Sequence, residues 1–196
     1  MQYYCLIQST GDDIGKASSQ IKGMKDGYNL YADNSVWKLP LFEKPKIEPN
    51  FNALQLNNSA KLTDIIIPTG LISKTGFFLS EKVKDILKDF ILPNHIYYKA
   101  VVIHKNKVYD NFYWIQFTQE MSDTIDYENS VFDLKRAFGW QNWTDVESNP
   151  KFKNTFELIE FDKMQSSMNQ IMPSKLSLIK NGFDIYGFRY FAIACP

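Results

Sequence analysis

The feature that most constrains the fold of this chain is a pair of aromatic-rich segments separated by a short polar break. Residues 96–104 are rich in Tyr, Ile and Val, and residues 108–118 carry large apolar side chains at both odd and even positions. Residues of these types are favoured in strands, and Lys105-Asn106-Lys107 between the two segments predicts an antiparallel hairpin. Because its large side chains point to both sides, we expect the second strand to be central in a sheet and covered on both faces.

A helix is predicted immediately before this hairpin. Ser80 is a preferred N-cap residue, and Glu81 places a carboxylate at the positive end of the helix dipole. An apolar stripe at helical spacing follows, made of Val83, Ile86, Leu87 and Phe90. Pro93 ends the helix because it lacks an N–H group. We expect the stripe to pack on the hairpin, so that Leu87→Ala would cost about 2–5 kcal/mol through the cavity it leaves.

The rest of the chain predicts several short strands and few helices. A short lead-in strand is expected between Leu71 and the helix, and a second helix at Lys175–Lys180, capped by Ser174. The segment Lys163–Met172 is read either as a short helix or as a loop. Further strands are predicted at residues 2–8, 28–31, 36–42, 53–56, 130–134 and 155–162. Residues 64–68 are read as a buried strand or a short apolar turn, and residues 183–194 as one bent strand or two short ones. The predicted fold class is α+β, with a largely antiparallel or mixed sheet and a few short helices packed on it.

The first third of the chain differs in character from the remainder. Residues 1–62 are polar, and several glycines and prolines interrupt them. We therefore expect an N-terminal strand-and-loop lobe over residues 1–62 and an α+β core domain over residues 63–196. The alternative is that the lobe forms part of the same domain as the core.

Composition excludes several classes of protein. The 196 residues carry a formal net charge of zero, without the basic footprint of a dedicated nucleic-acid binder. The chain begins without the charged lead and apolar run of a signal peptide, and no run approaches the length of a membrane span. Cys5 and Cys195 are expected to be reduced and buried rather than joined in a disulfide framework. We therefore expect a cytoplasmic protein that binds neither nucleic acid nor membranes.

The residue types that carry catalysis or bind metals form no recognisable motif. The two histidines, His95 and His104, have a spacing that fits no helical pair, and no cysteine or carboxylate constellation accompanies them. We interpret them as a turn histidine and a strand-end histidine. The sequence contains no G-x-S-x-G elbow, P-loop or G-x-G-x-x-G fingerprint. No catalytic residue, metal or cofactor is predicted.

Two neighbouring segments are candidates for binding a partner protein. The stretch from Gln119 to Asp133 contains no Lys or Arg, and its candidate contact residues are Glu120, Asp123, Asp126 and Glu128. A cluster of one sign steers association with a partner of opposite charge. Trp140 and Trp143 follow, and Trp is enriched among the residues that dominate binding energy. The alternatives are a solvated acidic loop and tryptophans that fill the edge of the core.

Several segments occur together in a pattern that is larger than any one motif. They are Gly76-Phe77-Phe78-Leu79-Ser80-Glu81 and the helix after it, the Leu92-Pro93 break, the aromatic strand, the Tyr113/Trp114 strand, Ser130-Val131-Phe132-Asp133 and the closing Gly182–Phe191 segment. Together they resemble a bacterial family, the immunity proteins of polymorphic toxin systems. The resemblance covers roughly residues 68–191. The resemblance implies a non-enzymatic protein that binds and neutralises a cognate toxin, and it transfers no catalytic residue.

The functional expectation is thus a protein-binding module of the immunity type. If the acidic stretch contacts the toxin, reversing the charge at Asp123 and Asp126 should weaken binding and leave thermal stability nearly unchanged. The alternative is a small-molecule-binding or enzymatic domain. It would use a pocket between the predicted helix and the first third, with His95, His104 or nearby carboxylates as its polar groups.

Overall fold

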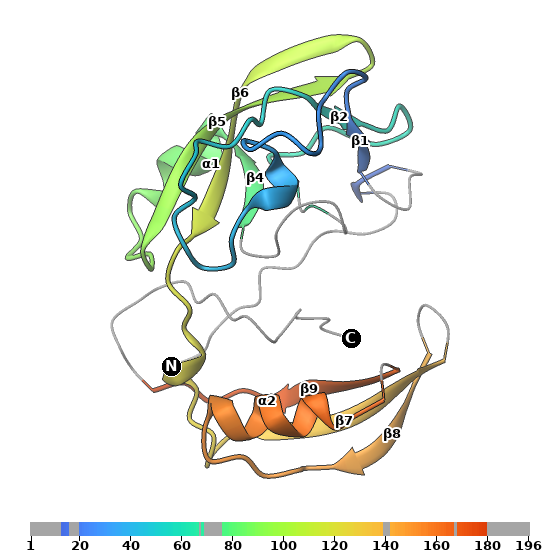
Figure 1. Cartoon of the computed structure of the whole chain (residues 1–196), viewed down its shortest axis with the longest axis vertical. Coiled ribbons are helices and arrows are strands. Elements are labelled where there is room, and N and C mark those ends of the chain that lie inside the picture. Colours follow the sequence, from blue (N-terminus) through green and yellow to red (C-terminus); the bar gives the residue numbers. More distant parts are fainter. Residues whose placement is uncertain are drawn as a thin grey trace. The chain divides into compact units, whose positions relative to one another are not determined.

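The computed structural model describes residues 13–15, 20–66, 68, 76–138, 142–166 and 168–179. The chain divides into two compact units (Figure 1). Of the described residues, those up to Gln119 form the N-terminal unit and those from Glu120 onward form the C-terminal unit. The division falls after Gln119 and not at residue 63, because strands from both sides of residue 63 belong to one sheet.

The N-terminal unit is built on a six-stranded mixed sheet. Its strands are β1 (Ile21–Met24), β2 (Leu54–Leu56), β3 (Ile65–Ile66), β4 (Gly76–Ser80), β5 (His95–His104) and β6 (Lys107–Phe117). The order across the sheet is β1-β2-β5-β6-β4-β3, in which β2 and β5 are parallel and the other neighbours antiparallel. With the helices described below, this confirms the predicted α+β class.

The predicted hairpin is present and its turn is tighter than expected. Only Lys105 and Asn106 lie between the strands, and both have positive φ, 49° and 63°. Two consecutive left-handed residues are the signature of the type I′ turn, whose twist matches that of paired strands. Lys107, predicted as part of the break, is already paired with His104 across the hairpin.

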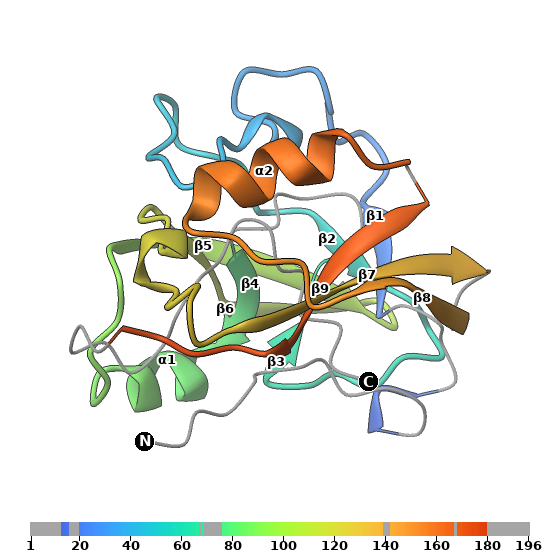
Figure 2. The same ribbon diagram turned by 90° about the horizontal axis from the view of Figure 1, so that it is seen from below.

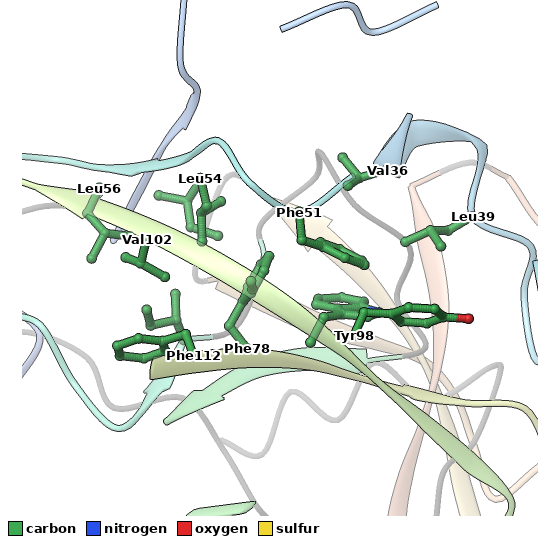
Figure 3. Packing of buried hydrophobic residues seen from close by; sticks show 13 residues of the cluster. Val36, Leu39, Phe51, Leu54, Leu56, Phe78, Tyr98, Val102 and Phe112 are labelled. Atoms are coloured by element: carbon green, nitrogen blue, oxygen red, sulfur yellow. The ribbon is translucent and has the colours of Figure 1, made fainter. Parts of the chain in front are cut away.

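Strand β6 is central, as predicted, and its second half, residues 112–117, is covered on both faces, whereas residues 107–111 are mostly exposed. On one face, Trp114 is fully buried, stacks on Phe51 with ring centroids 5.3 Å apart and meets Phe78 edge-on at 4.9 Å. Figure 3 shows this cluster, to which the loop segments contribute Val36, Leu39 and Phe51. Gly76 in β4 lies against the Trp114 ring, so that a Cβ there would be 2.7 Å from a ring carbon. The first third of the chain therefore forms one cover of the sheet.

The other face of the sheet is partly covered by α1 (Glu81–Leu87). As predicted, the Ser80 hydroxyl caps it by accepting a hydrogen bond from the Val83 N–H. Val83 and Leu87 pack, partly buried, against a small cluster of Leu79, Ile115 and Phe117. Ile86 and Phe90, the other half of the predicted stripe, remain about half exposed. The prediction that the whole stripe packs into the core is wrong, because a helix of two turns meets the sheet along one narrow line.

The C-terminal unit is a three-stranded antiparallel sheet with one helix. Strand β7 (Val131–Phe138) lies between β8 (Asn142–Ser148) and β9 (Asn169–Lys175). The helix α2 (Thr155–Lys163) runs along one face of this sheet (Figures 1 and 2). Its Leu158 joins a core that includes Phe132, Leu134, Phe152 and Ile171. The predicted strand over residues 130–134 is confirmed as the start of β7.

Several predicted elements differ from the structure. Residues 155–162, predicted as a strand, form α2, and residues 36–42 contain the 3-10 helix η2 (Val36–Lys38) instead of a strand. Residues 28–31 form turns, while the strand of that region is β1. The predicted helix at Lys175–Lys180 is absent from the described residues 175–179, since Lys175 ends β9. The short strand predicted at 53–56 is confirmed as β2, and of the two readings of residues 64–68 the strand is confirmed, as β3.

Some predictions fall on residues outside the described part of the chain. These are the terminal strand at 2–8, the closing run at 183–194, both cysteines and Trp140.

Candidate functional site

Two carboxylates of the acidic stretch shape the local backbone. The stretch contains the 3-10 helix η3 (Ser122–Thr124). The Glu120 carboxylate accepts hydrogen bonds from both the backbone N–H and the hydroxyl of Ser122. The Asp126 carboxylate accepts one from the Asn129 backbone, at 3.1 Å, and one from its amide group, at 2.9 Å. These donors, the side-chain amide above all, hold the pKa of the Asp126 carboxyl below its ordinary value. Reversal of the charge at Asp126 should therefore disturb this turn as well as any contact with a partner.

The other two candidate carboxylates are exposed. Asp123 lies in η3, where its Oδ1 is 3.4 Å from the Thr155 hydroxyl that donates to it. Glu128 lies in the turn before β7. Both can be reached by a partner, in contrast to Glu120 and Asp126, which are half-buried.

The structure separates the acidic stretch from Trp143. Trp143 is an exposed residue of β8 and pairs with Ala137, six residues beyond Val131 at the start of β7. At about 3.3 Å per strand residue, Ala137 lies roughly 20 Å from Val131, and all four candidate carboxylates come before Val131 in the chain. Within this one unit, Trp143 therefore lies far along β7 from the end at which the candidate carboxylates are found.

A surface that the sequence did not single out lies in the first third of the chain. We call it the 31–47 surface, after the segment that forms it. Within this segment four large apolar side chains are exposed: Tyr31, Trp37, Leu41 and Ile47. Tyr31 is 84% exposed and Trp37 50%, whereas Val36 beside Trp37 is fully buried. The segment thus places some residues in the core and others in solvent.

The backbone of the 31–47 surface is held in place by buried polar groups of the sheet and its flanks. Gln116, a fully buried residue of β6, donates hydrogen bonds from its amide group to the carbonyls of Pro40 (3.2 Å) and Glu43 (2.9 Å). The Tyr28 hydroxyl accepts from the Val36 N–H at 2.9 Å and donates to the carbonyl of Asn50. These contacts fix the loop before any partner arrives.

A shallow groove runs through the same segment. Its cavity volume is about 320 Å³. The lining residues include Asp33, Lys38, Leu39, Pro40, Glu43, Lys44, Pro45, Lys46, Ile47 and Pro49. Lys38 and Asp33, which both line the groove, form an ion pair with Nζ and Oδ1 2.9 Å apart. Of the four exposed apolar side chains, Ile47 lines the groove, and Trp37 and Leu41 are next in sequence to lining residues.

A second cavity, of about 450 Å³, lies at the start of α1. It is lined by Leu62, Thr63, Asp64, Ser80, Tyr109, Asn111 and Phe112. The Asp64 carboxylate accepts a hydrogen bond from the Ser80 hydroxyl at 2.7 Å, and its other oxygen is 3.7 Å from the Lys82 ammonium. Two of the polar side chains that line this cavity, Asp64 and Ser80, are therefore already hydrogen-bonded to each other.

The two histidines lie at opposite ends of β5 and line neither cavity. The Nδ1 atom of His95 is 2.7 Å from the Pro93 carbonyl oxygen, as expected of a turn histidine. His104 is buried beside the hairpin turn. The hypothesis that these histidines supply the polar groups of a pocket is wrong for both cavities.

Within the described ranges, no group of three or more His, Cys, Asp or Glu side chains is placed to hold a metal ion. No helix among the described residues is both long and apolar enough to cross a membrane.

Comparison of the chain with protein-family models, with curated proteins and with solved structures finds no match. The resemblance to immunity proteins therefore stays a prediction that rests on the sequence motifs alone.

Proposed function

We propose that this protein is a protein-binding module of the immunity type, which binds and neutralises a cognate bacterial toxin through its 31–47 surface. The observation that carries the proposal is the exposure of Tyr31 and Trp37 on a loop that buried hydrogen bonds hold in one conformation. By covering the toxin, the complex would keep it from its target.

The residue types of this surface support a role in binding. Trp and Tyr are the residues most enriched among those that dominate interface energy, because each buries a large area at low cost in side-chain entropy. Ile47 lines the adjoining groove, and Lys38, Lys44 and Lys46 supply charges around it. An interface with a central aromatic anchor and a charged rim has this composition.

The anchoring of the loop supports the same role. A loop that orders only on binding loses affinity, since its conformational entropy is lost in the same step. The hydrogen bonds from Gln116 to Pro40 and Glu43 span more than seventy residues of sequence, so they fix the loop relative to the sheet. The partner would meet a surface that is already formed.

The acidic residues and Trp143 are candidates for a second contact. Asp123, Glu128 and Trp143 are all exposed in the C-terminal unit. Asp123 and Glu128 come before the start of β7, whereas Trp143 pairs with Ala137 near its end. A partner would therefore meet the acidic turn and Trp143 as two distinct contacts.

The proposal is tested by identifying the partner and then mutating the surface. Co-purification from the native host followed by mass spectrometry should recover a toxin domain, and co-expression of this chain should relieve its toxicity. Trp37→Ala and Tyr31→Ala should each weaken binding by about 30-fold or more if they are interface anchors. Failure of the wild-type chain to protect cells from any co-purified protein would contradict the proposal.

The matched control is Phe156→Ala. Phe156 is a large side chain of α2 with 69% exposure, and it lies in the other unit. Its removal should leave affinity within about twofold of the wild type. All three variants should retain the wild-type melting temperature within a few degrees, since each truncates an exposed side chain. If all three variants lost the same amount of affinity, the loss would not be specific to the 31–47 surface.

The alternative function, binding of a small molecule, is favoured by one observation, the cavity at the start of α1. Its volume of about 450 Å³ lies in the range of small-molecule sites. A metabolite screen by thermal shift tests it, with Asn111→Trp as the variant that fills the cavity. A ligand that stabilises the wild type and not this variant would favour the alternative over the protein-binding role.

A further inference from the structure

A cluster of lysines and tyrosines lies on the α1 side of the N-terminal sheet. Lys99 of β5 and Tyr113 of β6 are directly opposite each other, and Tyr97 is the next β5 residue on that face. Lys84 reaches over them from α1, with its Nζ 3.8 Å from the centre of the Tyr113 ring and 5.3 Å from that of Tyr97. The Lys99 Nζ is 5.1 Å from the centre of the Tyr113 ring.

The two lysines of this cluster are held by aromatic rings and not by carboxylates. The neighbouring lysines of α1 are neutralised, Lys82 by Asp64 and Lys88 by Asp85. In the part of the chain that the structure describes, no carboxylate lies within ion-pair distance of Lys84 or Lys99. A cation over a ring keeps its full charge, so both ammonium groups can still bind an anion.

The cluster is accessible and its cations are prearranged. Lys99 is exposed, and Lys84, Tyr97 and Tyr113 are half-buried. Both ammonium nitrogens lie within 5.1 Å of the centre of one ring. A short segment that carries two carboxylates can therefore reach both of them.

The surroundings favour an acidic protein segment over a nucleic acid. Lys84 occupies the face of the Tyr113 ring on which a base would stack. Glu81 lies beside the cluster, its carboxylate 3.5 Å from the Tyr113 hydroxyl, and the field of such carboxylates opposes a long polyanion. One or two carboxylates can approach the lysines from the open side and avoid that repulsion.

We propose that Lys84, Lys99 and Tyr113 form a binding site for an acidic segment of a partner protein. The site shares no residue with the 31–47 surface, and it is assigned from the unneutralised lysines held on one ring. Tyr113 acts as a positioning residue, since it holds both ammonium groups and leaves their charges free.

The test uses the full-length protein and a Gly-Glu-Glu-Gly peptide with blocked ends, titrated by calorimetry at about 20 mM salt, where surface charges are little screened. The wild type should bind one peptide saturably. The double variant Lys84→Gln/Lys99→Gln should bind about tenfold more weakly, because it loses two exposed charge contacts. Tyr113→Leu should weaken binding by a smaller factor, since the charges remain but are no longer held together.

The matched control is Lys22→Gln/Lys25→Gln, which removes the same charge from two exposed lysines at the other end of the sheet. It should bind within about twofold of the wild type, and circular dichroism should show all variants folded. The proposal is overturned if the wild type does not bind the peptide saturably or if both double variants weaken binding equally. Tighter binding of inorganic phosphate or oligothymidylate than of the peptide, lost in the Lys84/Lys99 variant, would also overturn it.

Discussion

Asp126, a candidate contact residue because of its charge, stabilises a turn of the fold. Its carboxylate accepts hydrogen bonds from the backbone and the amide of Asn129, which closes the turn before β7. Asp side chains are common in such turns because they can bond the backbone a few residues on. A run of acidic residues in a sequence cannot distinguish a carboxylate that closes a turn from one that faces a partner, because both are polar and lie between regular elements.

The lowered pKa of Asp126 predicts a pH dependence of stability. Because the folded-state pKa is below the unfolded value, the ionised carboxylate stabilises the fold at every pH above the ordinary Asp pKa of about 3.9. That contribution is lost as the pH falls through the lowered folded-state pKa. Urea unfolding of the wild type and of Asp126→Asn, between about pH 2 and 6, should show a stability difference that shrinks in acid. A difference that is independent of pH would contradict this reading of the turn.

Gln116 marks the limit of residue-level prediction. It lies in a strand whose pattern was easily read, yet its fully buried amide holds Pro40 and Glu43 of a distant loop. Patterns in sequence are local, whereas this contact joins segments far apart in the chain. The 31–47 surface could be suspected only from large apolar residues scattered among prolines and lysines.

The central hairpin and α2 show why some elements were predicted and one was not. In the second half of β6 the large side chains occupy both parities, and few structures other than a central strand satisfy that pattern. In residues 155–162, Phe156 and Leu158 fit the alternation of a strand, whereas Leu158 and Phe161 fit the repeat of a helix. The deciding signal is local: the Asn154 side chain accepts from the Glu157 N–H, and a capping residue three positions before a Glu marks a helix start.

Truncation of a partly buried side chain in α1 should lower the free energy of unfolding less than truncation of a fully buried one in the sheet. Leu87 packs on the sheet but is only partly buried, whereas Leu79 of β4, in the same cluster, is fully buried. Leu87→Ala should therefore cost about 1–2 kcal/mol, below the sequence-based expectation, and Leu79→Ala about 2–5 kcal/mol. Chemical unfolding of both variants measures the two costs. Equal costs would mean that α1 is as deeply packed as the strand beneath it.

At the scale of the whole molecule, the division into two units is the feature that sequence patterns missed. The change from loop-rich to regular character near residue 63 suggested a boundary there, but β1 and β2 pair into the same sheet as the hairpin. The real division follows β6, where the chain leaves one sheet and begins another. Local composition indicates whether a segment forms regular secondary structure. It does not indicate which sheet a strand joins, because that depends on pairing with strands far away in the sequence.

Each unit has its own buried cluster, which predicts that their stabilities can be changed separately. Phe78 belongs to the cluster of the N-terminal unit and Phe132 to that of the C-terminal unit, and both are almost fully buried. Truncation to Ala should cost about 3–5 kcal/mol in each case. In amide hydrogen exchange, Phe132→Ala should lower the protection of β7 and β9 more than that of β5 and β6, and Phe78→Ala should do the reverse. If both variants lower protection equally in both sheets, the chain unfolds as one cooperative body and the two units are divisions of geometry alone.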